Sequence, residues 1–159
     1  MIEPEFHAAI LPSLQHQPVI LVADDEVMIR NLVTLLLQAH GYGVLSASDG
    51  QEALELSRKY PGTIELVITD VEMPRLNGMD LRARLLEERP GIRVIVMSGK
   101  EAGDILSQNV NLPFLPKPFD GQALLARVGE ILGVAARPSA KERPVPRPLL
   151  HRGTPGQSS

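Results

Sequence analysis

The chain has 159 residues, the size of one ordinary domain, and a net charge of −3 that does not favour a nucleic-acid binder with a basic surface. It contains no cysteine, which excludes disulfides, thiol catalysis and Cys-ligated zinc. No apolar run approaches the roughly 18 residues of a membrane span, and residues 1–17 carry no Lys or Arg as a signal peptide would, so we expect a soluble, cytoplasmic protein.

The first half of the chain predicts two strands and two helices in alternation. The apolar, β-branched run at residues 19–22 is too short for a helix and predicts a strand. A helix follows it and ends at Gly41. Residues 44–46 predict a second strand, and residues 51–58 predict a second helix, ended by Pro61-Gly62. The expected core face of the first helix is Ile29, Leu32, Val33, Leu36 and Ala39.

The second half continues the same alternation. Pro113 and Pro116 flank the last strand, and because proline cannot donate to a ladder we expect this strand at the sheet edge. Five strands that alternate with five helices predict a doubly wound parallel α/β sheet with strand order 2-1-3-4-5. The further strands are expected at residues 66–69, 94–97 and 114–115, and the further helices at 79–88, 102–108 and 122–132.

Charge and composition divide the chain into three parts. Residues 1–18 form an expected N-terminal leader, and residues 19–133 form the domain. Residues 134–159 carry five Lys and Arg against one Glu and hold five of the 14 prolines. This composition predicts a basic, disordered tail.

Polar side chains follow the strands of the predicted sheet at one edge. Asp24 and Asp25 follow the first strand, Asp70 the third, Ser98 the fourth and Lys117 the fifth. Ligands bind at this edge of a doubly wound sheet. Three ionised carboxylates need a compensating cation, and Mg²⁺ prefers such oxygen ligands. A helix cap or a solvated loop would explain one of these acids, but the whole set favours a phosphoryl-transfer site.

Residues 19–133 carry motifs that resemble the receiver domain of bacterial two-component response regulators, the family of the chemotaxis regulator. The resemblance implies a flavodoxin-like receiver fold. The motifs are Val22-Ala23-Asp24-Asp25-Glu26, Ile68-Thr69-Asp70-Val71-Glu72-Met73-Pro74, Asn77-Gly78-Met79-Asp80-Leu81, Val96-Met97-Ser98-Gly99 and Leu115-Pro116-Lys117-Pro118-Phe119.

The resemblance implies a phosphoacceptor and a metal site. Asp70 would take the phosphoryl group from a phosphohistidine on a partner protein. Asp25 would ligate Mg²⁺ directly and Asp24 mainly through water, with Asp70 and the backbone carbonyl of Glu72 as further ligands.

The resemblance also implies a phosphate-binding switch. Lys117 would pair with the acyl phosphate, and Ser98 would donate to a phosphoryl oxygen. Phe114 matches the aromatic residue that moves inward with this hydroxyl, although a packed core Phe is the simpler interpretation of the residue alone. The bond before Pro118 would be cis.

Two charged residues flank the expected path of water to the acyl phosphate. These are Glu72 and Lys100, which could pair across that path and slow the loss of phosphate. Both side chains could equally point into solvent, and this alternative stays open.

The 26 residues after Gly133 are too few for an effector domain, so we expect a stand-alone receiver that switches partner binding or relays phosphate. It would be no enzyme in the ordinary sense, but a phosphoacceptor that also accepts phosphate from small donors and loses it slowly. The expected partners are a histidine kinase or phosphotransfer protein and an unidentified target. Neither DNA nor membrane binding is expected, and the chain would be a monomer or weak homodimer.

Two alternatives remain. One is a receiver-like scaffold that binds partners without phosphorylation. The other is an aspartyl-phosphate phosphatase of the haloacid dehalogenase type, which needs a second Asp where this chain has Glu72.

The interval from Ser98 to Lys117 is short, and the helix expected at 102–108 lies within it. In the family that this chain resembles, this helix is part of the output face, the surface that usually binds the downstream partner. The form of the helix and of that surface therefore stays open.

Overall fold

The computed structural model describes residues 17–99 and 112–133 of the chain. Within these residues it contains four helices, none of which has the length and hydropathy to cross a membrane. The helix expected at residues 102–108, most of the leader, the tail and Lys100 lie outside the described residues. The elements are β1 (Val19–Ala23), α2 (Val27–Ala39), β2 (Gly43–Ala47), α3 (Gly50–Lys59), β3 (Leu66–Asp70), α4 (Gly78–Glu88), β4 (Arg93–Ser98), β5 (Phe114–Pro116) and α6 (Gly121–Leu132).

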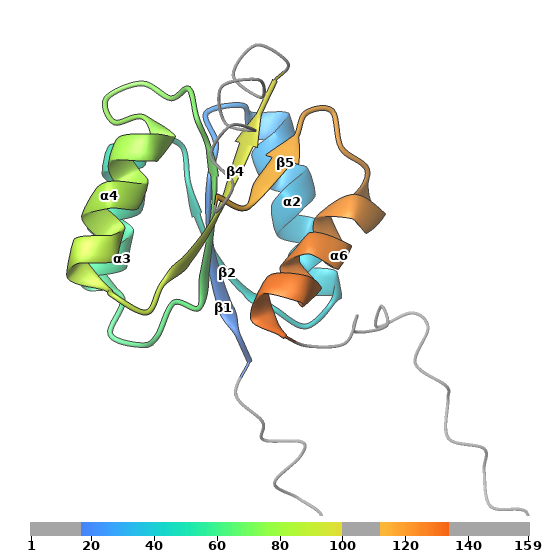
Figure 1. Cartoon of the computed structure of the whole chain (residues 1–159), viewed down its shortest axis with the longest axis horizontal. Helices are drawn as coiled ribbons and strands as arrows, with labels where there is room; N and C mark the ends of the chain where they lie inside the picture. The colour runs from blue at the N-terminus through green and yellow to red at the C-terminus, as the bar shows by residue number, and fades with distance from the viewer. Residues whose placement is uncertain (1–16, 100–111, 134–159) are drawn as a thin grey trace, which may run out of the picture.

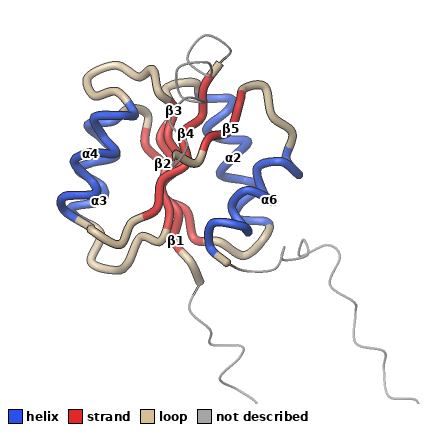
Figure 2. The backbone as a smooth tube through the Cα atoms, in the orientation of Figure 1, coloured by secondary structure: helices blue, strands red, loops and turns tan. Residues whose placement is uncertain are grey.

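The strands form one five-stranded parallel sheet in the order β2-β1-β3-β4-β5, which confirms the predicted order. β5 lies at an edge, as its flanking prolines predict. Helices α3 and α4 cover one face of the sheet, and α2 and α6 cover the other (Figures 1 and 2). The fold is therefore a three-layer sandwich with the carboxyl ends of all strands at one edge.

The central strands are apolar on both faces because both faces are covered. In β1, Leu21 and Ala23 pack into the cluster under α3 and α4. Ile20 and Val22 point the other way, into the cluster under α2 and α6. The same alternation in β3 and β4 gives two separate hydrophobic cores, one on each face of the sheet. These cores fix the positions of the strands and of their carboxyl ends.

The predicted core face of α2 is partly wrong. Val33 and Leu37 are fully buried, and Ile29 packs beside them, but Leu32 is 52% exposed and Ala39 is also exposed. The apolar residues of α2 lie around most of its circumference. Their spacing in the sequence therefore could not predict which face of the helix packs against the sheet. The other exposed apolar side chains of α2 are Val27 (57%), Met28 (86%) and Leu35 (65%).

Candidate functional site

The ends of four strands bring the expected site residues to one edge of the sheet. Asp24 follows β1, Asp70 ends β3, Ser98 ends β4 and Lys117 follows β5. The strands are parallel and their ends are level with one another, so side chains from distant positions in the sequence meet here. The pairs that set this register are Ala23 with Thr69, Asp70 with Met97, and Ser98 with Pro116.

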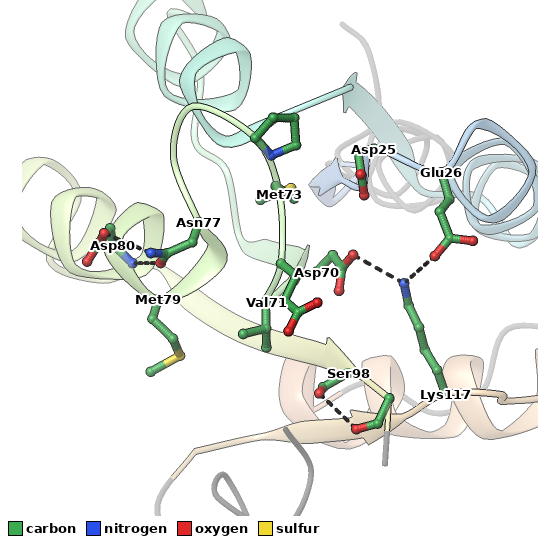
Figure 3. A pocket seen from close by; sticks show the side chains of 13 residues that line it. Asp25, Glu26, Asp70, Val71, Met73, Asn77, Met79, Asp80, Ser98 and Lys117 are labelled. Atoms are coloured by element: carbon green, nitrogen blue, oxygen red, sulfur yellow. Dashed lines mark hydrogen bonds and ion pairs between the residues drawn. The ribbon is translucent and has the colours of Figure 1, made fainter. Parts of the chain in front are cut away.

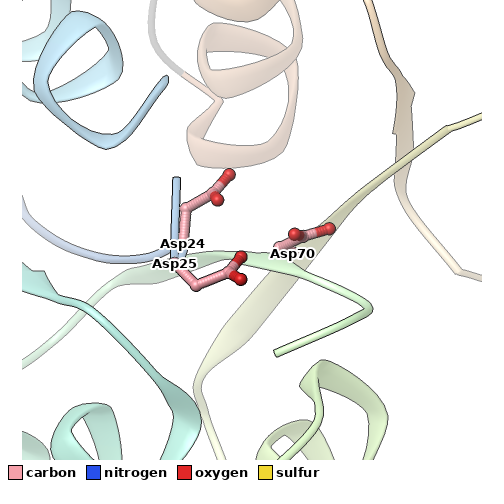
Figure 4. A group of neighbouring side chains, drawn as sticks. All are labelled: Asp24, Asp25 and Asp70. Atoms are coloured by element: carbon pink, nitrogen blue, oxygen red, sulfur yellow. The ribbon is translucent and has the colours of Figure 1, made fainter. Parts of the chain in front are cut away.

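Three carboxylates form the centre of the site (Figure 4). Oxygens of Asp24, Asp25 and Asp70 all lie within 4.8 Å of one another. Asp24 is fully buried and Asp70 is 7% exposed, whereas Asp25 is exposed. The backbone N–H of Glu26 donates to Asp24 Oδ1 at 2.9 Å, which fixes the Asp24 side chain.

The ammonium group of Lys117 faces this cluster (Figure 3). Its Nζ lies 3.0 Å from Asp24 Oδ2, 3.4 Å from Asp70 Oδ2 and 3.6 Å from Glu26 Oε1. Burial opposes the charged form of Lys117, but the hydrogen bond and the charge of Asp24 outweigh it, so the pKa of Lys117 is raised. Lys117 therefore stays protonated at neutral pH.

One ammonium does not neutralise the neighbouring carboxylates. Burial raises the pKa of Asp70 to about 6; Lys117 opposes this rise, and the charges of Asp24 and Asp25 add to it. Excess negative charge among hard oxygen donors is the setting that a divalent cation relieves. The residues present therefore fit Mg²⁺, with Asp24, Asp25 and Asp70 as its expected carboxylate ligands.

The loop after β3 is packed tightly against the phosphoacceptor position. The N–H of Gly78 donates to the carbonyl of Val71 at 2.9 Å. A Cβ atom at Gly78 would lie 2.0 Å from the carbonyl oxygen of Asp70, so only glycine fits here. Asn77 accepts a hydrogen bond from Asp80 N and caps α4. Gly78 thus allows the close turn by which the chain enters α4.

The remaining residues of the expected site lie in different surroundings. Ser98 is buried, and its hydroxyl donates to the carbonyl of Gly99 at 3.1 Å. Glu72 is exposed and lines the pocket. Phe114 is half-buried and packs against the core under α3 and α4. The Lys117–Pro118 bond is cis, which is the geometry that the resemblance implies.

Two residues whose side chains contact the site were assigned no role from the sequence. Glu26 approaches Lys117, and its position beside the acidic pair was the only signal available. Arg30 donates to the backbone carbonyl of Asp24 at 2.7 Å. It is the single charged residue of α2, which is the signal that could have marked it.

Comparison with known proteins agrees with this geometry. The response regulator receiver domain family matches residues 20–129. The chain belongs to that family. Receiver domains are phosphoacceptors, they act with histidine kinases or phosphotransfer proteins, and they bind Mg²⁺ at an acidic pocket. This membership sets aside the haloacid dehalogenase alternative.

The curated relatives of this receiver domain are longer proteins. It is 36% identical over 117 residues to the sensor kinase CckA of Brucella abortus. The aligned region covers 71% of this chain and 12% of that protein. It is 34% identical over 115 residues to the transcriptional regulatory protein CpxR of Escherichia coli. The aligned region covers 71% of this chain and 48% of that protein. The chain therefore spans half or less of the length of these relatives.

Solved structures share the fold of this receiver domain. The crystal structure of a response regulator receiver domain protein from Clostridium thermocellum has a TM-score of 0.66 and 33% identity, over 73% of this chain and 94% of that one. A CheY-like receiver domain protein from Methanospirillum hungatei has a TM-score of 0.66 and 25% identity, over 74% and 95% of the two chains.

Proposed function

We propose that Asp70 of this receiver domain accepts a phosphoryl group from the phosphohistidine of a sensor kinase or phosphotransfer protein, in a Mg²⁺-dependent reaction. The observation that carries this proposal is the meeting of Asp70 with Asp25 and Lys117 in one pocket, with buried Asp24 in contact with Lys117 beside it. A scaffold that never reacts has no need for a partly buried lysine between two carboxylates that are themselves close together.

The reaction is a displacement at phosphorus. A carboxylate oxygen of Asp70 forms the new P–O bond, the P–N bond breaks, and its electron pair stays on the imidazole nitrogen of the donor. Since the pKa of Asp70 is about 6, its nucleophilic, ionised form prevails at neutral pH. Lys117 is 3.4 Å from Asp70 and placed to donate to an oxygen of the arriving phosphoryl group.

Mg²⁺ held by the three aspartates and the Glu72 carbonyl would supply the positive charge that lets two anions approach each other. Ser98 would then turn its hydroxyl from the Gly99 carbonyl to a phosphoryl oxygen, with Phe114 as the aromatic residue of the switch. This change would alter partner binding or precede transfer of the phosphoryl group to a relay partner. The stand-alone character of the receiver and the absence of DNA binding stay predictions.

The exposed face of α2 supports docking of a protein donor. Its apolar side chains begin at Val27 and Met28, directly after Asp25 and Glu26 at the mouth of the pocket. Protein interfaces are depleted of charge at their centre, and the exposed positions of this helix carry none. A partner that brings a phosphohistidine to Asp70 would cover this face.

The decisive experiment uses acetyl phosphate, because a small donor needs no cognate kinase. With Mg²⁺, the full chain should gain the mass of one phosphoryl group, whereas Asp70→Asn should gain none. The gain should also disappear when EDTA removes the metal. A wild-type chain that takes up no phosphate would support the scaffold alternative, and a mass gain that survives in Asp70→Asn would show that another residue is the acceptor.

A further inference from the structure

Arg75 lies at a strained turn in the loop that follows Asp70. Its φ is +67°, and it is the one non-glycine residue with positive φ among those described. The N–H of Leu76 donates to the carbonyl of Pro74 at 2.8 Å, which closes a three-residue turn around Arg75. A side chain as large as arginine adopts this backbone conformation only when other contacts hold it there.

An ion pair with α3 provides such a contact. Arg75 Nε lies 2.9 Å, and its terminal guanidinium nitrogen 2.5 Å, from Asp49 Oδ2. The other oxygen of Asp49 accepts from Glu52 N at 2.8 Å and caps α3. The Asp49 side chain is 9% exposed and the Arg75 side chain 61% exposed, so the fixed member of the pair is Asp49.

The backbone beside Arg75 also packs on the start of α3. A Cβ atom at Gly50 would lie 2.1 Å from the carbonyl oxygen of Leu76, so the loop and the helix approach as closely as two backbones can. The two ends of the loop also meet, because Gly78 packs against the carbonyl group of Asp70. The segment from Asp70 to Leu76 contains Glu72, whose carbonyl is the expected metal ligand.

We propose that Arg75, through its ion pair with Asp49, is a positioning residue for the reaction of Asp70. It ties residues 71–77 to the first turn of α3 and so fixes the position of Glu72, which lines the acidic pocket. Arg75 itself touches none of the reacting atoms. The inference rests on the proposed function for its effect on phosphorylation, but its effect on the loop is independent of that function.

Three variants separate the ion pair from the helix cap and from the turn. Asp49→Asn removes the charge but keeps a side chain that caps helices equally well. Arg75→Ala removes the pair and keeps the strained φ, whereas Arg75→Gly removes the pair and the strain together. Arg58→Ala is the matched control. Arg58 makes a comparable ion pair with Glu88, but this pair lies at the C-terminal ends of α3 and α4, whereas Asp49 caps the N-terminal end of α3.

Two measurements on the full chain test the proposal without phosphorylation. Hydrogen exchange of the metal-free protein should be several-fold faster at residues 71–78 in Arg75→Ala and Asp49→Asn. Calorimetric titration with Mg²⁺ should give dissociation constants about two- to fivefold higher, the range that the loss of a partly exposed ion pair predicts. Arg75→Gly should lie closer to the wild type than Arg75→Ala in Mg²⁺ affinity, and Arg58→Ala should match the wild type in both measurements.

Acetyl phosphate then tests the consequence for the reaction. The rate in Arg75→Ala should fall at low Mg²⁺ and recover at saturating Mg²⁺, which separates positioning from loss of the fold. Unchanged exchange and Mg²⁺ affinity in Arg75→Ala and Asp49→Asn overturn the proposal, and so does an equal loss in Arg58→Ala. A wild-type chain that takes up no phosphate instead overturns the proposed function and leaves the two loop measurements to decide the role of Arg75.

Discussion

Lys117 donates a 3.0 Å hydrogen bond to Asp24 across 93 positions of the sequence. The contact joins the ends of β1 and β5, two strands that are not neighbours in the sheet. The lysine side chain therefore reaches over the end of the sheet to the acidic cluster. Its charge stabilises buried Asp24 before any ligand binds, and a phosphoryl group on Asp70 would offer it a new acceptor.

Replacing Lys117 with methionine should slow phosphorylation without weakening the metal site. The loss of one charged hydrogen bond to the phosphoryl group corresponds to a rate at least about tenfold lower. Mg²⁺ affinity should stay the same or increase, because the ammonium competes with the metal for the same carboxylates. Intact-mass time courses with acetyl phosphate and calorimetric Mg²⁺ titrations measure the two effects. Lys59→Met, at the exposed end of α3, is the control, and a Lys117→Met rate equal to that of the control would contradict the assigned role.

Asp70→Asn should stabilise the metal-free protein at neutral pH. The pKa of Asp70 rises from 3.8 to about 6 in the folded protein, so folding favours its protonated form. The stabilisation from this group is present below pH 3.8 and is lost as the pH rises through about 6. Asn mimics the neutral carboxyl, and the gain in free energy of unfolding at pH 7.5 should be about 3 kcal/mol.

Thermal melts with EDTA at pH 5 and pH 7.5 test this dependence on pH. The advantage of Asp70→Asn over the wild type should shrink at pH 5, where the wild-type carboxyl is already protonated in the folded state. Adding Mg²⁺ at pH 7.5 should raise the melting temperature of the wild type more than that of the variant. An advantage that is the same at both pH values would show that repulsion at Asp70 is not its cause.

The lifetime of the phosphorylated protein should depend on Glu72 and Lys100. Glu72 is exposed at the pocket, and an ion pair with Lys100 would shield the acyl phosphate from water. The double variant Glu72→Ala/Lys100→Ala should lose phosphate several-fold faster than the wild type, since a barrier change of only 1.36 kcal/mol is tenfold in rate. Each single variant should show most of the effect in a decay series followed by intact mass. Identical decay in all four proteins would mean that both side chains act independently in solvent.

A charge on the exposed face of α2 should separate protein donors from small donors. Leu32→Glu/Leu35→Glu should keep its acetyl phosphate rate but lose at least about tenfold with phosphorylated histidine phosphotransfer domains, because a buried unpaired charge weakens the complex. Ala83→Glu, an exposed position on α4 on the other side of the sheet, is the control. An undiminished rate from every donor that phosphorylates the wild type would rule out docking on this face.

The sheet and the acidic site could be predicted because both depend on local patterns. The apolar strands β1 and β3 had to be covered on both faces, which implies parallel order and crossover helices. Parallel order then places the residues after each strand at one edge, whichever helices lie between them. The sequence therefore predicted that Asp24, Asp70 and Lys117 lie close together, and the structure shows them in contact through Lys117.

Only the tertiary structure decided which face of α2 is buried. It also decided which ion pairs the charged side chains form. Leu32 and Leu37 are equally apolar, and the position of the helix over the sheet exposes one and buries the other. Arg75 and Asp49 belong to different loops, and neither has a spacing or a neighbour that indicates the other. An ion pair depends on distances of a few ångströms between separate segments, and the packing of the two cores against the sheet sets those distances.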